Sequence, residues 1–581
     1  MQGLRATLKE HRHFIAVVAL LTLVMTFPTI VYVIRTDVFA LPTNDSTDVF
    51  IKLWDIWYGR QILLGKADRF YTDLLYYPAG ASLAYHPLFF LHSIVVSALQ
   101  LLLPLANAYS AAYLLSVSSC ALAAYIYLRW LFTDKWVALF GAVVFGFCPF
   151  AVSVPQQPEI IWIAPLPLVI YFAHRGFRER RTRLIMLAGI LGGLTCDVTL
   201  YFYVVVLMSV GLALTAFAAL QWRDRAFWGR AALLIALFAL FSGWRILPML
   251  QNATDFDSAL SYYGEYEVKI DLLSLVFSRG NPILGSVSDA ILQSADAVAL
   301  SFGSYLGVLP VMLATAGLAK RRLRRGMLPW LGFGLVFLLL SLGTTLVMNG
   351  IEYVDVKLPK HYLNQLAPSV FASIVHPTFF MPGVYLALAV LASFGLRALY
   401  DRPRARPALV LLLVALVAFE YYSPTRMQFT DQITGNPFTE ERLAFVDWLK
   451  REEMEDIALI NLPLGRDNAK VYLYYQSLTG YPQTEGGISR PPQSLYDYFR
   501  ANPVLSIWLE QRPTNCIIQD RDEYLDGLAE LVEDGYTHIT HHYGFYFWQR
   551  QIESFRNVEP AYSDDYVSIY RLRDMLESCP K

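Results

Sequence analysis

Acidic and aromatic side chains occur together in one polar stretch of the sequence, between Thr43 and Phe90. Asp45 and Asp48 near its start are candidate general bases, because a positioned carboxylate can deprotonate a hydroxyl group. The aromatic residues suit a sugar, since the C–H face of a sugar ring packs on an aromatic side chain and its hydroxyls bond to acids. They are Trp54, Trp57, Tyr58, Phe70, Tyr71, Tyr76 and Tyr77. Tryptophan and tyrosine are also enriched at membrane interfaces without binding a sugar. Asp55, in the same stretch, is interpreted as a solvated acid.

Four further charged residues lie near the ends of long apolar segments, namely Glu159, Asp197, Arg245 and Glu420. A charge near hydrocarbon costs about 2.5–3.5 kcal/mol on insertion scales, so such residues are candidates for function. Arg245 could bind a phosphate, because guanidinium matches phosphate in a bidentate geometry, although an interfacial arginine fits equally well. Glu159 follows a polar break at 155–158 that could face a site. Asp197 could do the same or cap the helix that follows it.

The elements that must position these residues are apolar helices. The chain has 581 residues, of which 55% are hydrophobic and 16% charged, and its net charge is −1. The apolar residues are concentrated in spans of about 20 residues, which indicates a polytopic α-helical membrane protein. The near-neutral charge gives no reason to expect a nucleic acid as partner. The spans lie at approximately 14–34, 109–131, 136–153, 159–174, 184–198, 200–220, 230–250, 300–319, 327–346, 379–398 and 406–423.

Basic clusters between the spans set the expected orientation, because positively charged loops stay in the cytoplasm. Placing the clusters at 175–183, 223–230, 320–325 and 397–406 there gives about eleven transmembrane helices. The N-terminus is then cytoplasmic, while the large first loop, 35–88, and the C-terminal part are extracytoplasmic. All four helix-end charges share this outer face. The apolar stretch 88–104 is expected to be an interfacial or re-entrant segment, with a twelfth crossing as the alternative.

From residue 424 onward the apolar spans stop, and helical and strand patterns alternate. Helices are expected at 440–450, 467–478 and 521–532, and strands at 457–464, 516–519 and 536–540. The sequence therefore predicts a transmembrane domain over 1–423 and an extracytoplasmic α/β domain over 424–581 that folds on its own. Cys516 and Cys579 could form a disulfide or stay unpaired. No cysteine spacing resembles a zinc site, so no cofactor is predicted, and a divalent metal is left open.

Short motifs follow one another along nearly the whole chain. In the first loop these are Asp48 with Phe50, Trp54 and Trp57, then Thr72-Asp73, Tyr77-Pro78-Ala79-Gly80 and His86-Pro87. Later ones are Gly193-Leu194, Tyr201–Tyr203, Asp271–Leu275, Asn281–Gly285, Tyr305–Gly307, Asn461–Leu464, Gly486-Gly487 and Ser489-Arg490. Their order resembles that of the C-type (GT-C) membrane glycosyltransferases, in particular the bacterial group related to protein mannosyltransferases and aminoarabinose transferases.

The resemblance implies that an acidic residue of the first outer loop is the catalytic base or positions the acceptor. Asp48 matches that position best and Asp45 second, although the adjacent Asp-Glu pair of the mannosyltransferase type is absent. Substrate-binding residues are expected at Asp73, His86, Glu159, Asp197, Arg245 and His376. His376 departs from the pattern, because related chains often carry an arginine there; a protonated histidine could partly replace it.

The resemblance further implies an enzyme of the bacterial plasma membrane that transfers a sugar from a polyprenyl-phosphate-linked donor. The acceptor would be a glycan, a lipid or a protein on the extracytoplasmic face. Two alternatives are a transporter or flippase for a lipid-linked substrate and a non-catalytic membrane scaffold. Transporters usually place polar groups near the bilayer midplane, and the sequence shows none there. The acidic residues of the first loop and Arg245, expected on the same outer face, argue against a non-catalytic scaffold.

Overall fold

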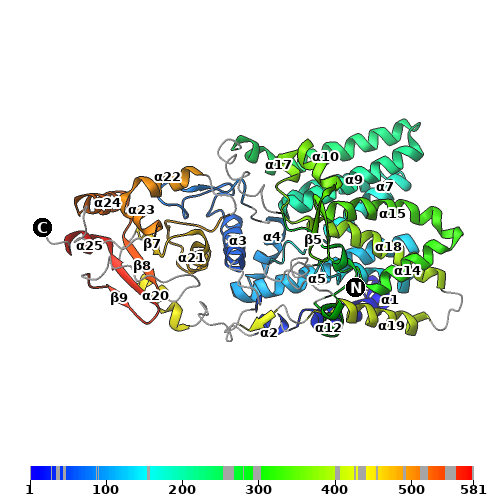
Figure 1. The fold of residues 1–581 in the computed structure, drawn as a ribbon, viewed down its shortest axis with the longest axis horizontal. Coiled ribbons are helices and arrows are strands. Elements are labelled where there is room, and N and C mark those ends of the chain that lie inside the picture. Colours follow the sequence, from blue (N-terminus) through cyan, green and yellow to red (C-terminus); the bar gives the residue numbers. More distant parts are fainter. Residues whose placement is uncertain are drawn as a thin grey trace. The chain divides into compact units, whose positions relative to one another are not determined.

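The computed structural model divides the chain into two compact units (Figure 1). Unit 1 comprises Met1–Ile34, Ser110–Leu247 and Leu260–Met427, and unit 2 comprises Arg35–Tyr109, Pro248–Ala259 and Gln428–Lys581. The structure describes all residues except 1, 28, 35–39, 43–47, 87, 89, 153–156, 253–266, 279, 292–302, 400–405, 424–426, 430–439, 453–455, 489–492, 511–520, 544–557 and 579–581.

Unit 1 is built from apolar helices. Five helices of the described residues are long and apolar enough to cross a membrane, namely α5 (Leu105–Phe132), α9 (Leu200–Gln221), α10 (Arg225–Gln251), α15 (Arg321–Ser341) and the segment Pro377–Leu399, which joins η4 (Pro377–Phe380) to α18 (Met381–Leu399). The further apolar helices of unit 1 include α1 (Gln2–Met25), α2 (Thr29–Ile34), α6 (Lys135–Gly146), α7 (Pro165–Arg178), α8 (Thr182–Leu194), α12 (Pro282–Ile291), α14 (Val308–Ala319) and α19 (Arg406–Tyr421). Every predicted span overlaps one of these helices, but a count of about eleven crossings stays a prediction.

Short elements connect the helices of unit 1. They are η1 (Thr195–Asp197), η3 (Leu272–Leu275), the antiparallel pair β4 (Thr345–Met348) and β5 (Ile351–Lys357), and the helices α16 (Pro359–Leu366) and α17 (Pro368–Phe371). Helix α18 forms the centre of the bundle and packs against α6, α14 and α15. Glycine makes the approach to α14 close, because a Cβ at Gly395 would stand 1.8 Å from the Leu313 carbonyl oxygen. Such small-residue contacts are typical of packing between membrane helices.

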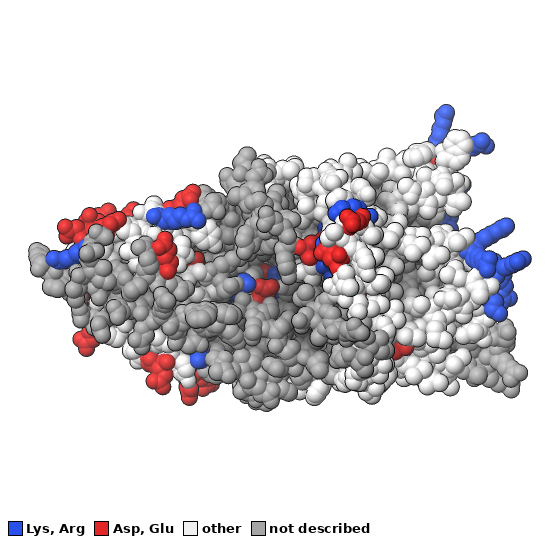
Figure 2. Space-filling model, viewed as in Figure 1, with Lys and Arg blue, Asp and Glu red and all other residues white. Residues whose placement is uncertain are grey.

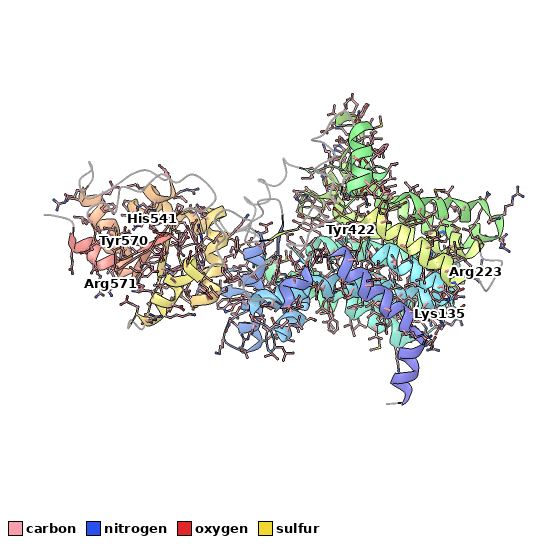
Figure 3. All side chains as sticks on the ribbon, turned by 90° about the horizontal axis from the view of Figure 1, so that it is seen from below. Lys135, Arg223, Tyr422, His541, Tyr570 and Arg571 are labelled. Atoms are coloured by element: carbon pink, nitrogen blue, oxygen red, sulfur yellow. The ribbon has the colours of Figure 1, made fainter. Side chains whose placement is uncertain are left out.

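The two ends of this bundle differ in charge. Figure 3 places Lys135 and Arg223 at one end of unit 1 and Tyr422 at the other. Lys and Arg side chains protrude from that first end in Figure 2. Helix α10 begins at Arg225, so Arg245 lies about 30 Å further along it at 1.5 Å per residue. This separation is about the thickness of a bilayer core, as the predicted threading requires. Which end faces the cytoplasm stays a prediction.

Unit 2 contains a four-stranded sheet in the order β7-β8-β10-β9. Strands β7 (Leu459–Leu462) and β8 (His538–His542) are parallel, whereas β10 (Val567–Arg571) runs antiparallel to both β8 and β9 (Tyr562–Ser563). The helices of this unit are α20 (Glu440–Arg451), α21 (Arg466–Thr479), α22 (Gln493–Ala501), α23 (Pro503–Leu509), α24 (Arg521–Glu533) and α25 (Leu572–Ser578). The strand predicted at 516–519, together with Cys516 and Cys579, lies outside the described residues.

The first loop belongs to unit 2. It contributes β1 (Ala40–Pro42), which pairs with β6 (Met427–Phe429), and α3 (Asp48–Leu63), β2 (Tyr71–Thr72) and β3 (Ala81–Ser82). Helix α4 (Phe90–Leu99) follows the loop in the same unit. One hydrophobic core combines Trp54, Tyr58 and Leu75 of this loop with Ile460 and Trp508. This core joins segments on both sides of the boundary predicted at 424, and that boundary stays a prediction. The stretch 88–104 contains the short helix α4, which packs against α3.

Candidate functional site

Helix α3 carries the acids of the first loop. Asp48 is its first residue, where the positive end of the helix dipole stabilises a carboxylate. Lys52 and Asp55 follow at the fourth and seventh positions after Asp48, and this spacing places all three on one face of the helix. Of the three, Asp48 alone is accessible: its side chain is 36% exposed, against 7% for Lys52 and 1% for Asp55.

The Asp48 carboxylate pairs with a lysine from the C-terminal segment. Lys470 Nζ, on the second turn of α21, lies 3.1 Å from Asp48 Oδ1. The lysine side chain is 16% exposed. This pair joins two residues far apart in the sequence, so no local pattern pointed to Lys470. Asp45, the second candidate base, lies outside the described residues.

The interpretation of Asp55 as a solvated acid is wrong. Its carboxylate is buried, with Oδ1 at 2.7 Å from His86 Nε2 and Oδ2 at 3.2 Å from Lys52 Nζ. His86, which the sequence predicted to bind substrate, is 0% exposed and makes an edge-type ring contact with Trp54. The three groups anchor α3 to the end of the first loop. Asp73, also predicted to bind substrate, lies exposed after β2.

The remaining predicted site residues belong to unit 1, and three gather around the start of α9. Asp197 is buried in η1, and the Sγ atom of the neighbouring Cys196 lies 3.9 Å from the Ser242 carbonyl oxygen. Ser242 is on α10, about one turn before Arg245. Arg245 itself is 3% exposed. The side chain of Tyr201 stacks on Phe379 with a ring separation of 4.7 Å, and that ring also contacts His376 at 5.9 Å. The structure thus brings together the neighbourhoods of Asp197, Arg245 and His376.

Two other acids have different surroundings. Glu159 is 2% exposed and lies in the turn before α7. Glu420 caps a helix, since its two carboxylate oxygens accept from the Leu309 amide at 3.2 and 3.3 Å at the start of α14. A capping carboxylate at a helix N-terminus has a sufficient structural reason for its position.

One buried acid of unit 2 escaped the sequence analysis. Glu485 is 2% exposed, and its Oε2 accepts from the Gly465 amide at 2.7 Å at the start of α21. Burial raises the pKa of this carboxyl group to about 7. It follows the strand-like stretch 481–484 and precedes the Gly486-Gly487 motif, so its sequence resembles that of an ordinary loop acid. Within the described residues, no cluster of three or more His, Cys, Asp or Glu side chains could hold a metal ion.

Comparison with solved structures identifies the fold. Two structures of the arabinofuranosyltransferase AftD from Mycobacteria match 97% of this chain, with TM-scores of 0.52 and 0.54 and identities of 14% and 13%. The chain spans 41% of the length of AftD. The archaeal oligosaccharyltransferase AglB from Archaeoglobus fulgidus matches 92% of this chain and 70% of its own, with a TM-score of 0.44 and 13% identity. No family model and no curated protein matches the sequence.

The fold is therefore that of the C-type membrane glycosyltransferases, as the order of motifs predicted. At these identities the likeness concerns the fold alone. Together with the apolar helices it supports an integral membrane protein, and its neighbour AftD is an arabinofuranosyltransferase.

Proposed function

We propose that this protein transfers a sugar from a polyprenyl-phosphate-linked donor to an acceptor hydroxyl on the extracytoplasmic face of a bacterial plasma membrane. The observation that carries the proposal is the likeness of fold to AftD over 97% of the chain. A lipid-linked donor suits a site whose cationic candidate, Arg245, lies near the end of an apolar helix. The acceptor would be a glycan, a lipid or a protein.

The chemistry needs a base for the acceptor and a cation for the leaving group. In the proposed step, Asp48 takes the proton of the acceptor hydroxyl, whose oxygen then bonds to the anomeric carbon of the donor. The bond from that carbon to the phosphate oxygen breaks, and the phosphate keeps the electron pair. Arg245 would stabilise the charge that develops there. Partial exposure supports Asp48 in this role, because a base must be reached by the acceptor and Asp55 on the same helix is buried.

The donor class can be tested directly. Purified protein in detergent would be given the same sugar either on polyprenyl phosphate or on a nucleoside diphosphate, with product measured by mass. We expect transfer from the lipid-linked donor alone. Arg245→Met should lower kcat/KM for this donor by roughly 10²-fold or more, as loss of a transition-state donor does. The control is Arg230→Met at the other end of α10, which removes a partner of Asp224. Efficient transfer from the nucleotide sugar would contradict the proposal.

A further inference from the structure

The Asp48–Lys470 pair lies at the start of two helices that run side by side. Asp48 meets Lys470, and Trp54, six residues further along α3, donates its indole N–H to Gln476 Oε1 at 2.7 Å, six residues further along α21. Between these pairs, the rings of Phe50 and Tyr474 are 6.3 Å apart. Equal spacing in the same direction means that the helices are parallel. Contacts about 9 Å apart along both axes fix their register.

Gln476 joins this helix pair to the rest of unit 2. Its amide nitrogen donates to the Leu74 carbonyl at 2.5 Å and to the Tyr481 carbonyl at 3.0 Å. All its polar atoms are thus used, and the residue is 1% exposed. The geometry that brings Lys470 to Asp48 is therefore set by a buried network six residues further along α21, nearly two helical turns away.

The stem of Lys470 is confined by a glycine of the Gly486-Gly487 motif. A Cβ at Gly487 would stand 2.6 Å from Lys470 Cγ and 3.1 Å from Lys470 Cα. Any larger residue would force the lysine or its helix to move. The preceding glycine is held as well, because the Tyr76 hydroxyl donates to the Gly486 carbonyl at 2.5 Å. The motif thus has a physical role, which is to let the backbone lie against Lys470.

We infer that Lys470 is a positioning residue of the glycosyl transfer reaction, which holds the Asp48 carboxylate in the orientation that receives the acceptor proton. Asp48 is the first residue of its helix and partly exposed, so its side chain has more freedom than those of the buried acids. A cation at 3.1 Å on a second, fixed helix restricts that freedom. Gly487 contributes indirectly by confining the lysine. The inference rests on the proposed function and assigns part of its site to the C-terminal segment.

The test compares kcat and KM for the acceptor in Lys470→Met, Lys470→Arg and Asp48→Asn, with a polyprenyl-phosphate sugar as donor. Lys470→Met should lower kcat roughly 10–100-fold, the scale of a small misplacement, with acceptor KM changed less than about twofold. Lys470→Arg, which keeps the cation, should restore most of this loss. Arg571→Met is the matched control, since Arg571 forms an exposed ion pair with Glu452 at 2.7 Å in the same unit and should leave kcat unchanged (Figure 3).

The outcomes separate the two proposals. Loss of turnover in Asp48→Asn with wild-type kcat in Lys470→Met would overturn the role of Lys470 and leave the proposed function intact. Wild-type turnover in Asp48→Asn would instead refute Asp48 as the base. Thermal unfolding of each variant shows whether it is folded. If Lys470→Met is not folded, Lys470→Gln, which is polar and similar in length, decides the matter by the same two measurements.

Discussion

At the scale of single residues, burial distinguishes acids that look alike in the sequence. Asp48, Asp55 and Asp73 all occur in one polar stretch, yet only Asp55 is enclosed in a network with Lys52 and His86. Lys52 lies three residues before Asp55, so helical spacing could have suggested this pair. His86 lies thirty-one residues after Asp55, and no local pattern could have suggested that contact. The sequence therefore identified the acids but could not rank them by environment.

Replacing Asp55 should destabilise the protein instead of being harmless. Asp55→Asn removes the negative charge beside the buried ammonium group of Lys52, and breaking a buried ion pair costs about 3–5 kcal/mol. We expect a clear fall in the thermal unfolding temperature in detergent. Asp73→Asn, at an exposed position, should leave that temperature unchanged. Equal unfolding temperatures for both variants would mean that the network contributes nothing to stability.

Glu485 should make stability depend on pH in the opposite sense to an ordinary acid. Its pKa is about 7 in the folded protein and near 4.5 when solvated, so the folded state binds more protons between these values. Its contribution to the free energy of unfolding therefore falls as pH rises from 4.5 to 7, by up to about 1.4 kcal/mol per pH unit. Glu485→Gln lacks this loss. The unfolding temperature of the variant relative to wild type should increase from pH 5 to pH 8, and a constant difference would contradict the assignment.

At the scale of elements, hydrophobic periodicity predicted several helices and two strands of unit 2 but missed helix α3, which is buried on most sides. Helices α20, α21 and α24 and strands β7 and β8 lie within or beside the segments that were expected. Helix α3 was not predicted, because ten of its residues are buried and its apolar residues follow no single stripe. Strands β9 and β10 were also missed. Their polar residues, such as Ser563 and Ser568, bond to each other across the sheet, which a linear pattern does not reveal.

Strand β8 should make unit 2 sensitive to acid. Burial lowers the pKa of His538 and His541 to about 4 and that of His542 to about 3. Each is neutral when folded and charges near 6.5 when unfolded, so its stabilisation is complete above pH 6.5 and is lost as pH falls toward 4. The ring of His542 stacks on Tyr472 and Tyr475. We expect His542→Phe to reduce the loss of unfolding temperature between pH 7 and pH 4.5. An unchanged slope would contradict this account.

At the scale of the whole molecule, unit 2 is assembled from segments at both ends of the chain. Residues 424–581 alone would lack Trp54, Tyr58 and Leu75, which are at most 1% exposed in its core. Core side chains of the fragment, such as Ile460 and Trp508, would then lose apolar neighbours, and exposing a large apolar side chain costs about 1.5–3 kcal/mol. We therefore expect that fragment to aggregate when expressed alone. A chain that links 35–109 to 428–581 should instead give a cooperative unfolding transition and mixed α/β circular dichroism. A folded, cooperative 424–581 fragment would show that the first loop is dispensable.

The central claim is that the partly exposed carboxylate of Asp48, at the start of α3, is the base for glycosyl transfer, and one substitution tests it most directly. Asp48→Asn keeps the size and exposure of the side chain and removes its ability to take a proton. The matched control is Asp522→Asn, which removes an exposed acid from the first turn of α24 in the same unit.

Single-turnover transfer from a polyprenyl-phosphate sugar would be measured for both variants, after thermal unfolding has confirmed that they are folded. We predict a rate roughly 10²–10⁴-fold below wild type for Asp48→Asn, the usual contribution of a positioned base, and a wild-type rate for Asp522→Asn. Transfer at the wild-type rate by folded Asp48→Asn protein would contradict the account.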